Sequence, residues 1–155
     1  MRIIIGSDHG GVERKREIIE FLEREGHSVE NRGVDTEDLV DYPDIAQDVC
    51  EQYKRGGYDF GILLCGTGIG ISISANKIRG IRCALLFDEY TAKMAKAHNN
   101  ANFIAFGGRN TYSTGLADMM TTFMDTEFEG GKHQRRVSKI AILEEEPLGE
   151  ENVAS

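Results

Sequence analysis

The chain has 155 residues and a mass of 17.2 kDa, which fits one domain, since domains cluster at roughly 100–200 residues. Its 26 acidic residues against 18 Lys and Arg give a formal net charge of −8, which argues against a general nucleic-acid binder and against a protein that binds anionic membranes. A hydrophobic fraction of 40% and a charged fraction of 28% are ordinary for a soluble globular protein.

Strand-like and helix-like segments alternate along the chain. The predicted strands are short apolar or β-branched runs: Arg2–Ser7, His27–Arg32, Phe60–Cys65, Ile81–Phe87 and Asn102–Phe106. The predicted helices have apolar residues at helical spacing: Gly11–Glu25, Pro43–Arg55, a segment after Gly70 that ends at about Ile78, Asp88–His98, Tyr112–Met124 and Lys132–Leu143. This alternation indicates an α/β fold with a five-stranded parallel sheet, covered on both faces, and an extra C-terminal helix.

The amino-terminal residues and the cysteines bear on the cellular compartment. Met1–Gly6 does not resemble a signal peptide, and no apolar stretch approaches the ~18–20 residues that cross a bilayer. Three cysteines, Cys50, Cys65 and Cys83, make an odd count without CxxC spacing, which indicates neither a disulfide framework nor a zinc site. The sequence therefore predicts a cytoplasmic protein, with one domain over residues 1–143 and an acidic tail over residues 144–155.

Ligands of such folds bind beyond the carboxyl ends of the strands. One loop at that edge begins at a cysteine and is rich in glycine: Cys65, Gly66, Thr67, Gly68, Ile69 and Gly70. Glycines let backbone N–H groups approach a ligand, and the helix that follows favours an anion or a thiolate. The spacing is neither GxGxxG nor a Walker loop, so no nucleotide cofactor is expected. A tight turn with a buried, inert cysteine remains an equal interpretation.

Other candidate residues also have plain structural interpretations. Asp8 next to His9 is either a helix N-cap or part of an anion and proton-transfer site. His98 and Asn99 end the fourth predicted helix, where Asn suits the left-handed geometry of a C-cap and a histidine is favourable at that end of the helix dipole. Arg109 follows the last strand and places a guanidinium at the same sheet edge.

The densest basic cluster of the chain runs from Lys132 to Arg136. A solvated helix face is the ordinary interpretation of such a run. Because residues four apart share one side of a helix, Lys132 and Arg136 also fit a phosphate dianion. A thiolate, a histidine, an oxyanion-binding loop and a phosphate clamp suit proton abstraction beside a carbonyl. They suit acyl transfer less well, because no acidic partner for the histidine is evident.

Seven motifs in one order resemble the ribose-5-phosphate isomerase B family, which also holds the galactose-6-phosphate isomerase subunits. The motifs that carry the resemblance are Ser7–Gly11, Asp41–Pro43, Cys65–Lys77, Gly80–Arg82, His98–Asn102, Gly107–Arg109 and Gly130–Arg136. The resemblance implies a Rossmann-like sheet and a cytoplasmic enzyme, free of metal and cofactor, that interconverts D-ribose 5-phosphate and D-ribulose 5-phosphate. It also implies a homodimer, sometimes paired into a tetramer, with each active site at the subunit interface.

The resemblance also implies residue roles. Cys65 corresponds to the base that moves a proton between C1 and C2 through a cis-enediol. Thr67 assists it, and the amides from Gly66 to Gly70 hold the enediolate. His98, with Asp8 nearby, corresponds to the histidine that opens the furanose ring. Contacts with phosphate or substrate fall on His9, Asn99, Arg109, Lys132 and Arg136, and the basic helix comes from the partner subunit.

Two positions distinguish this chain within the family. Some actinobacterial members use a Glu six residues after the cysteine position, where this chain has Ile71, so it resembles the cysteine branch. The first clamp residue is commonly Arg but is Lys132 here, and lysine cannot form a bidentate fork with phosphate. A six-carbon substrate, such as allose 6-phosphate or galactose 6-phosphate, therefore stays open, as does a flavodoxin-like binding module without catalysis. A metal-dependent mechanism is not expected, because the four histidines lack paired spacing, and a chelator should leave activity unchanged.

Overall fold

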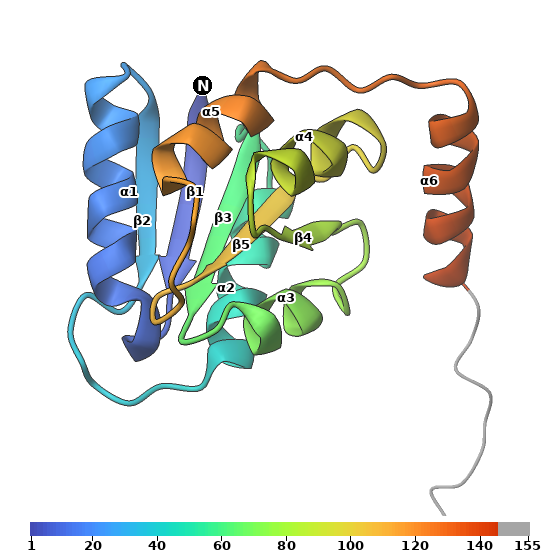
Figure 1. The fold of residues 1–155 in the computed structure, drawn as a ribbon. Coiled ribbons are helices and arrows are strands. Elements are labelled where there is room, and N and C mark those ends of the chain that lie inside the picture. Colours follow the sequence, from blue (N-terminus) through green and yellow to red (C-terminus); the bar gives the residue numbers. More distant parts are fainter. Residues whose placement is uncertain (146–155) are drawn as a thin grey trace, which may run out of the picture.

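The computed structural model describes residues 1–145, and its centre is one five-stranded sheet (Figure 1). All neighbouring strands are parallel, in the order β2-β1-β3-β5-β4. The strands are β1 (Arg2–Ser7), β2 (Ser28–Gly33), β3 (Phe60–Cys65), β4 (Cys83–Leu85) and β5 (Phe103–Gly107). The predicted five-stranded parallel sheet is therefore confirmed.

Helices cover both faces of the sheet. After a 3₁₀ turn η1 (His9–Gly11), the helices are α1 (Val12–Arg24), α2 (Tyr42–Lys54), α3 (Ile69–Ala75), α4 (Glu89–Ala97), α5 (Leu116–Asp125) and α6 (Lys132–Leu143). Apolar residues of α1, α4 and α5 pack in one core with alternate residues of the strands, such as Ile3 and Ile5. Those of α2 and α3 pack in a second core with the intervening residues, such as Ile4. This division is the predicted three-layer arrangement.

Three predicted elements differ from the structure by more than one residue, and local hydrogen bonds that compete with the regular pattern account for two of them. The strand expected over Ile81–Phe87 is only β4, since the backbone N–H of Phe87 donates to the Thr91 hydroxyl that caps α4. The helix after the glycine loop ends at Ala75, where the Asn76 side chain pairs with the backbone of Cys83 at 2.8 Å in both directions. Helix α5 begins four residues after its expected start, Tyr112.

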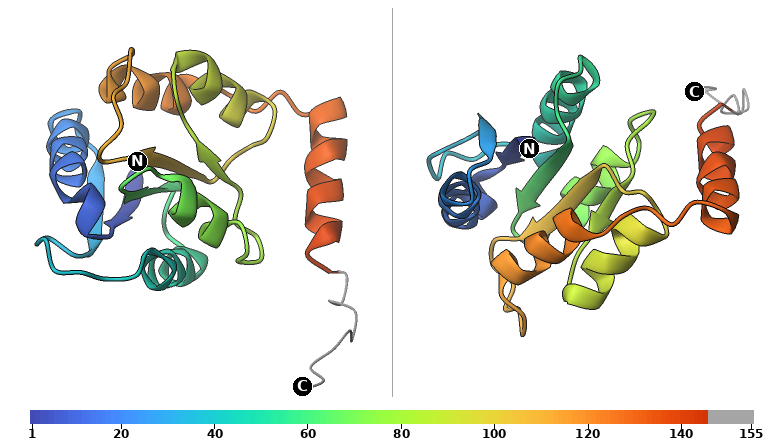
Figure 2. Two further views of the ribbon diagram at one scale, coloured as in Figure 1. Left: turned by 60° about the horizontal axis from the view of Figure 1, so that its bottom comes forward. Right: turned by 90° about the horizontal axis from the view of Figure 1, so that it is seen from above.

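Helix α6 stands apart from the two helical layers, beside the β4 edge of the sheet (Figures 1 and 2). Its first residues lie near the strands' amino ends, and its last turn reaches the α3–β4 connection, where the Glu144 carboxylate accepts the N–H of Gly80 at 3.0 Å. Of the predicted acidic tail, Glu144 and Glu145 make such contacts, and residues 146–155 lie outside the described part. Within residues 1–145, no helix has the length and apolar character that crossing a bilayer requires.

Lys15 is a buried cation that anchors the chain after β2. Its side chain is 1% exposed. The ammonium donates to the carbonyls of Arg32 at 3.0 Å and Val34 at 2.7 Å and pairs with Asp35 at 2.8 Å. The hydrogen bond from Lys15 is the largest cause that holds the pKa of Asp35 below its ordinary value. This anchor fixes the start of the loop that passes the candidate site.

We expect Lys15→Met to lower the free energy of unfolding by about 1–3 kcal/mol. That is the usual cost of leaving a buried polar group without its hydrogen-bond partner, and this substitution leaves two carbonyls without theirs. Urea unfolding measures the change in the free energy of unfolding. The control is Arg16→Met, because Arg16 forms only an exposed pair with Glu13 and should cost about 0.5 kcal/mol or less. Equal losses in the two variants would contradict the anchoring role of Lys15.

Candidate active site

The loops that follow β1, β3 and β5 meet at the carboxyl edge of the sheet. In the sheet, β1 lies between β2 and β3. The chain runs from β1 to β2 on one side of β1 and returns to form β3 on its other side, so the topological switch point of the sheet lies between β1 and β3. Here the N–H of Asp8 donates to the carbonyl of Leu64 at 3.2 Å, and the N–H of Gly108 donates to that of Cys65 at 2.8 Å. Three segments far apart in the sequence therefore surround Cys65.

Glycine is required where these loops touch. A Cβ atom on Gly10 would lie 2.8 Å from the backbone nitrogen of Gly66, and one on Gly108 would overlap the carbonyl of Gly10. A Cβ atom on Gly70 would lie 2.6 Å from the ring of Tyr42, which comes from the Asp41–Pro43 motif. Backbone amides can therefore approach a ligand here more closely than side chains would allow.

Cys65 is 4% exposed and ends β3 at the start of the loop. Its sulfur accepts a hydrogen bond from the backbone N–H of Gly68 at 3.1 Å. The left-handed conformation of Gly68, with φ of 77°, makes this hydrogen bond possible. An N–H donor stabilises a thiolate more than a thiol. Among residues 1–145, the N–H groups of Gly66 and Thr67 have no protein acceptor, so they can bind a substrate oxygen beside the sulfur.

The other two cysteines differ from Cys65. All three are free and buried and belong to the second core, but Cys50 lies within α2 and Cys83 begins β4, whereas Cys65 ends β3 at the carboxyl edge. Burial raises the pKa of the Cys50 thiol to about 12 and that of Cys83 well above its ordinary value. A raised pKa favours the thiol over the nucleophilic thiolate at both positions.

Asp8, His9 and Arg109 lie around the same loop. Asp8 is 5% exposed, and its carboxylate accepts the N–H of Gly10 at 2.8 Å, so the structural N-cap role is present. His9 Nδ1 accepts the N–H of Val40 at 3.4 Å, which leaves Nε2–H as a donor. Arg109 is exposed at the loop, and its N–H donates to the carbonyl of Gly66 at 2.9 Å. His9 and Arg109 line one pocket of about 430 Å³.

His98 and Asn99 lie at the opposite edge of the sheet. Helix α4 begins beyond the carboxyl end of β4 and runs back, and its nine residues span about 13 Å. His98 is the C-cap of α4, and Asn100 has a positive φ of 43°, so the C-cap interpretation is also present. Arg82 holds this turn through the carbonyls of Asn99 at 3.1 Å and Asn100 at 2.7 Å.

Lys132 and Arg136 are exposed on the first turns of α6. Glu129, just before this helix, donates its N–H to the carbonyl of Ala97 at 3.0 Å, so α6 starts beside the end of α4. Among the described residues, Lys132 and Arg136 form no ion pair. Within one chain the predicted site residues therefore form two groups at opposite edges of the sheet. The Cys65 group also contains Asp8, His9 and Arg109, and the His98 group also contains Asn99, Lys132 and Arg136.

Two residues of these groups escaped the sequence analysis. The Asn110 side chain donates to the carbonyl of Thr67 at 3.0 Å and so braces the cysteine loop from the β5 side. Glu129 faces His98 and is the acidic partner that seemed absent from the sequence. The only signal for either was its position directly beside a glycine-containing motif.

A parallel α/β sheet with a cysteine and free amides at its switch point, and with exposed cations for an anion, suits an isomerase that moves a proton beside a carbonyl. The ribose/galactose isomerase family model matches residues 3–140. The chain belongs to this family, which confirms the resemblance seen in the sequence and the prediction that the chain is an isomerase.

Relatives match the chain over nearly its whole length. A putative sugar phosphate isomerase of Bacillus subtilis is 46% identical, covering 96% of this chain and all of the relative. Ribose-5-phosphate isomerase B of Escherichia coli is 39% identical, covering 93% of this chain and 97% of the relative. The solved structure of ribose-5-phosphate isomerase B from Clostridium thermocellum is 47% identical, with a TM-score of 0.88 over 94% of this chain and 98% of that one.

Proposed function

We propose that the chain interconverts D-ribose 5-phosphate and D-ribulose 5-phosphate, a step of the pentose phosphate pathway. The observation that carries the proposal is the Cys65 sulfur, which accepts one backbone N–H and lies beside two free ones. That arrangement suits a base next to an oxyanion site. The names of the E. coli and C. thermocellum relatives support the same reaction. The three free cysteines fit a reducing compartment, the cytoplasm.

The reaction starts with ring opening by His98, with Asp8 beside the sugar. The Cys65 thiolate then removes the proton from C2 of the open aldose, and the electron pair of that C–H bond forms the enediolate. Amides from Gly66 to Gly70 hold the enediolate oxygen, and the Thr67 hydroxyl assists the proton shift between O1 and O2. Cys65 returns its proton to C1, which gives the ketose without gain or loss of any atom.

The smallest assembly with a complete site is a homodimer. Cys65 lies at the carboxyl edge of the sheet, whereas His98 is separated from it by the length of α4. A second copy that places its own His98 and α6 against the first chain's Cys65 loop joins the two groups. A groove of about 720 Å³ between α6 and the body, lined by Asn99, Ile140 and Leu143 among others, is available for packing by that copy.

The phosphate then meets cations from both chains. His9 and Arg109 of one chain approach the phosphate from the Cys65 group. Lys132 and Arg136 approach it from α6 of the partner subunit, which also contributes Asn99. All four side chains can donate hydrogen bonds to phosphate oxygens, and Lys132 and Arg136 are four residues apart on one helix. A dianion held this way supplies binding energy far from the reacting carbons.

A six-carbon sugar phosphate is the second candidate substrate, because Lys132 is a point charge that cannot hold phosphate in a bidentate fork. We expect kcat/KM to be higher for ribose 5-phosphate than for allose 6-phosphate or galactose 6-phosphate, with solvent deuterium incorporated at the carbon that loses its proton. A higher kcat/KM for a six-carbon substrate would replace the proposed substrate. Binding of all three sugars without any deuterium incorporation would contradict catalysis and indicate a binding module.

A further inference from the structure

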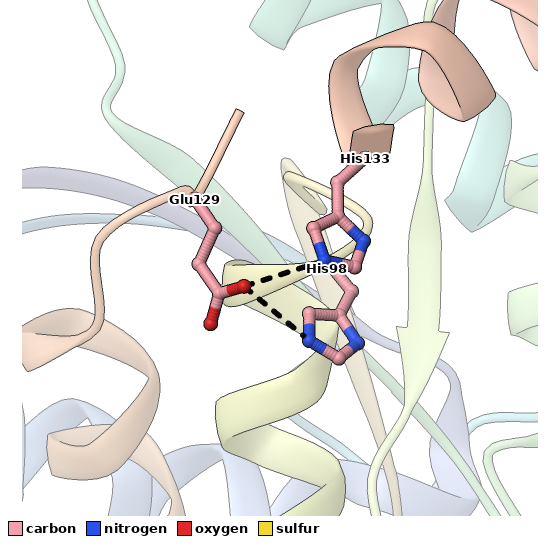
Figure 3. Close-up of side chains that lie close together, drawn as sticks. All are labelled: His98, Glu129 and His133. Atoms are coloured by element: carbon pink, nitrogen blue, oxygen red, sulfur yellow. Dashed lines mark ion pairs between the residues drawn. The ribbon is translucent and has the colours of Figure 1, made fainter. Parts of the chain in front are cut away.

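Glu129 connects two histidines that come from different helices. Its Oε2 lies 3.3 Å from Nε2 of His133 and 3.7 Å from Nε2 of His98. Figure 3 shows both rings with that nitrogen turned toward the carboxylate. The imidazole rings stack with their centroids 4.0 Å apart and their planes 9° apart. The three side chains therefore form one cluster.

The backbone fixes the carboxylate from both sides. The N–H of Glu129 donates to the carbonyl of Ala97 at 3.0 Å, one residue before His98. Gly130 and Gly131 follow with φ values of 65° and 54°, which turn the chain into α6. The N–H of His133 donates to the carbonyl of Gly130 at 2.9 Å. Glu129 is thus tied to the end of α4 and to the start of α6 at the same time.

The charges around the cluster suit a shared carboxylate better than a shared metal ion. Lys132 and Arg136 add positive charge on the same helix turns as His133, and they help to lower its pKa. A carboxylate between two rings is favoured by these cations, whereas a metal cation is opposed.

His133 is the buried ring of the pair, and its pKa is lowered. Burial is the largest cause that lowers its pKa, and the neighbouring His98 lowers it further, against the attraction of Glu129. His133 is 5% exposed, whereas the His98 side chain is 39% exposed. His133 therefore serves as a stacking surface, and His98 is the ring that a sugar can reach.

We propose that Glu129 is a positioning residue that orients His98 for ring opening, an inference that rests on the proposed function. A carboxylate facing Nε2 favours the tautomer with the N–H at Nε2, so Nδ1 has the lone pair. Nδ1 accepts the proton of the O1 hydroxyl while the bond between C1 and the ring oxygen breaks. The electron pair stays on the ring oxygen, which then receives the same proton from Nδ1. No net proton is gained or lost.

The test compares a cyclic with an acyclic substrate in Glu129→Gln, which keeps the shape of the side chain but removes its charge. Ribulose 5-phosphate has its O5 phosphorylated and cannot close a five-membered ring, so its exchange with solvent deuterium needs no ring opening. We expect kcat for ribose 5-phosphate to fall about 10–100-fold, part of the 10²–10⁴-fold that a positioned acid–base group contributes. The KM for ribose 5-phosphate and the exchange rate of ribulose 5-phosphate should stay within about twofold of the parent values.

The matched control is Glu127→Gln, an exposed glutamate two residues away, which should leave both reactions unchanged. An increase of KM for both sugars in Glu129→Gln, with kcat retained, would show that Glu129 only holds α6, and would overturn the proposal. Unchanged kinetics would overturn it as well. His98→Asn should show the same separation of the two reactions. A parent protein that neither isomerises ribose 5-phosphate nor exchanges ribulose 5-phosphate would overturn the proposed function instead.

Discussion

Replacing Cys65 with alanine should abolish the isomerisation of ribose 5-phosphate and leave the fold intact. The reason is that the Cys65 sulfur lies at the switch point, accepts the backbone N–H of Gly68 and lies beside the backbone N–H groups of Gly66 and Thr67, which have no protein acceptor within residues 1–145. A positioned base contributes about 10²–10⁴-fold to a rate, so kcat should fall at least that far. Deuterium exchange at C1 of ribulose 5-phosphate should also fall by at least this factor, because both measurements require the same proton transfer by Cys65.

Cys50→Ala is the matched control for this prediction. It also removes a buried thiol, but one whose pKa is raised to about 12 by its apolar surroundings and which lies away from the loops. We expect full activity from it, with a modest loss of stability. Circular dichroism and thermal unfolding should show that Cys65→Ala remains folded. Near-normal turnover by folded Cys65→Ala would assign the base to another residue.

The central strands were predictable because both are continuous apolar runs. Arg2–Ser7 and Phe60–Cys65 have the bounds expected from the sequence, and each is followed by residues that turn the chain. The strand expected over Ile81–Phe87 is only Cys83–Leu85 in the structure, because the backbone N–H of Phe87 donates to the Thr91 hydroxyl instead of a neighbouring strand. Such bonds join residues whose spacing gives no periodic signal.

The candidate residues were predictable, but their positions within one chain were not. The predicted strands place Cys65 at the end of one strand and Arg109 shortly after another, and parallel strands bring those ends together. His98 instead follows a helix, and the length of that helix carries it to the other edge of the sheet. Glu129 has no pattern of its own, because its role depends on a backbone hydrogen bond to Ala97. Only the tertiary structure places the candidate residues in two groups at opposite edges of one copy.

Two inactive variants should regain activity when their subunits are mixed. Cys65→Ala removes the base from one half of the site, and His98→Asn removes the ring-opening group from the other half. In a mixed dimer, one site receives both altered residues, and the other receives the intact Cys65 of one subunit and the intact His98 of its partner. With random pairing, half of the dimers are mixed and each has one good site, so activity should reach about a quarter of the parent value.

The measurement is the rate of ribose 5-phosphate isomerisation after the two variants are unfolded together and refolded, with each variant refolded alone as the control. Each variant alone should stay inactive, because every one of its sites has the same defect. Native mass spectrometry of a mass-tagged subunit establishes that mixed dimers are present. Mixed dimers without activity would place Cys65 and His98 of a working site in the same chain, which the length of α4 opposes. Recovery of about a quarter would show that the Cys65 loop of one subunit works with the His98 cluster of the other.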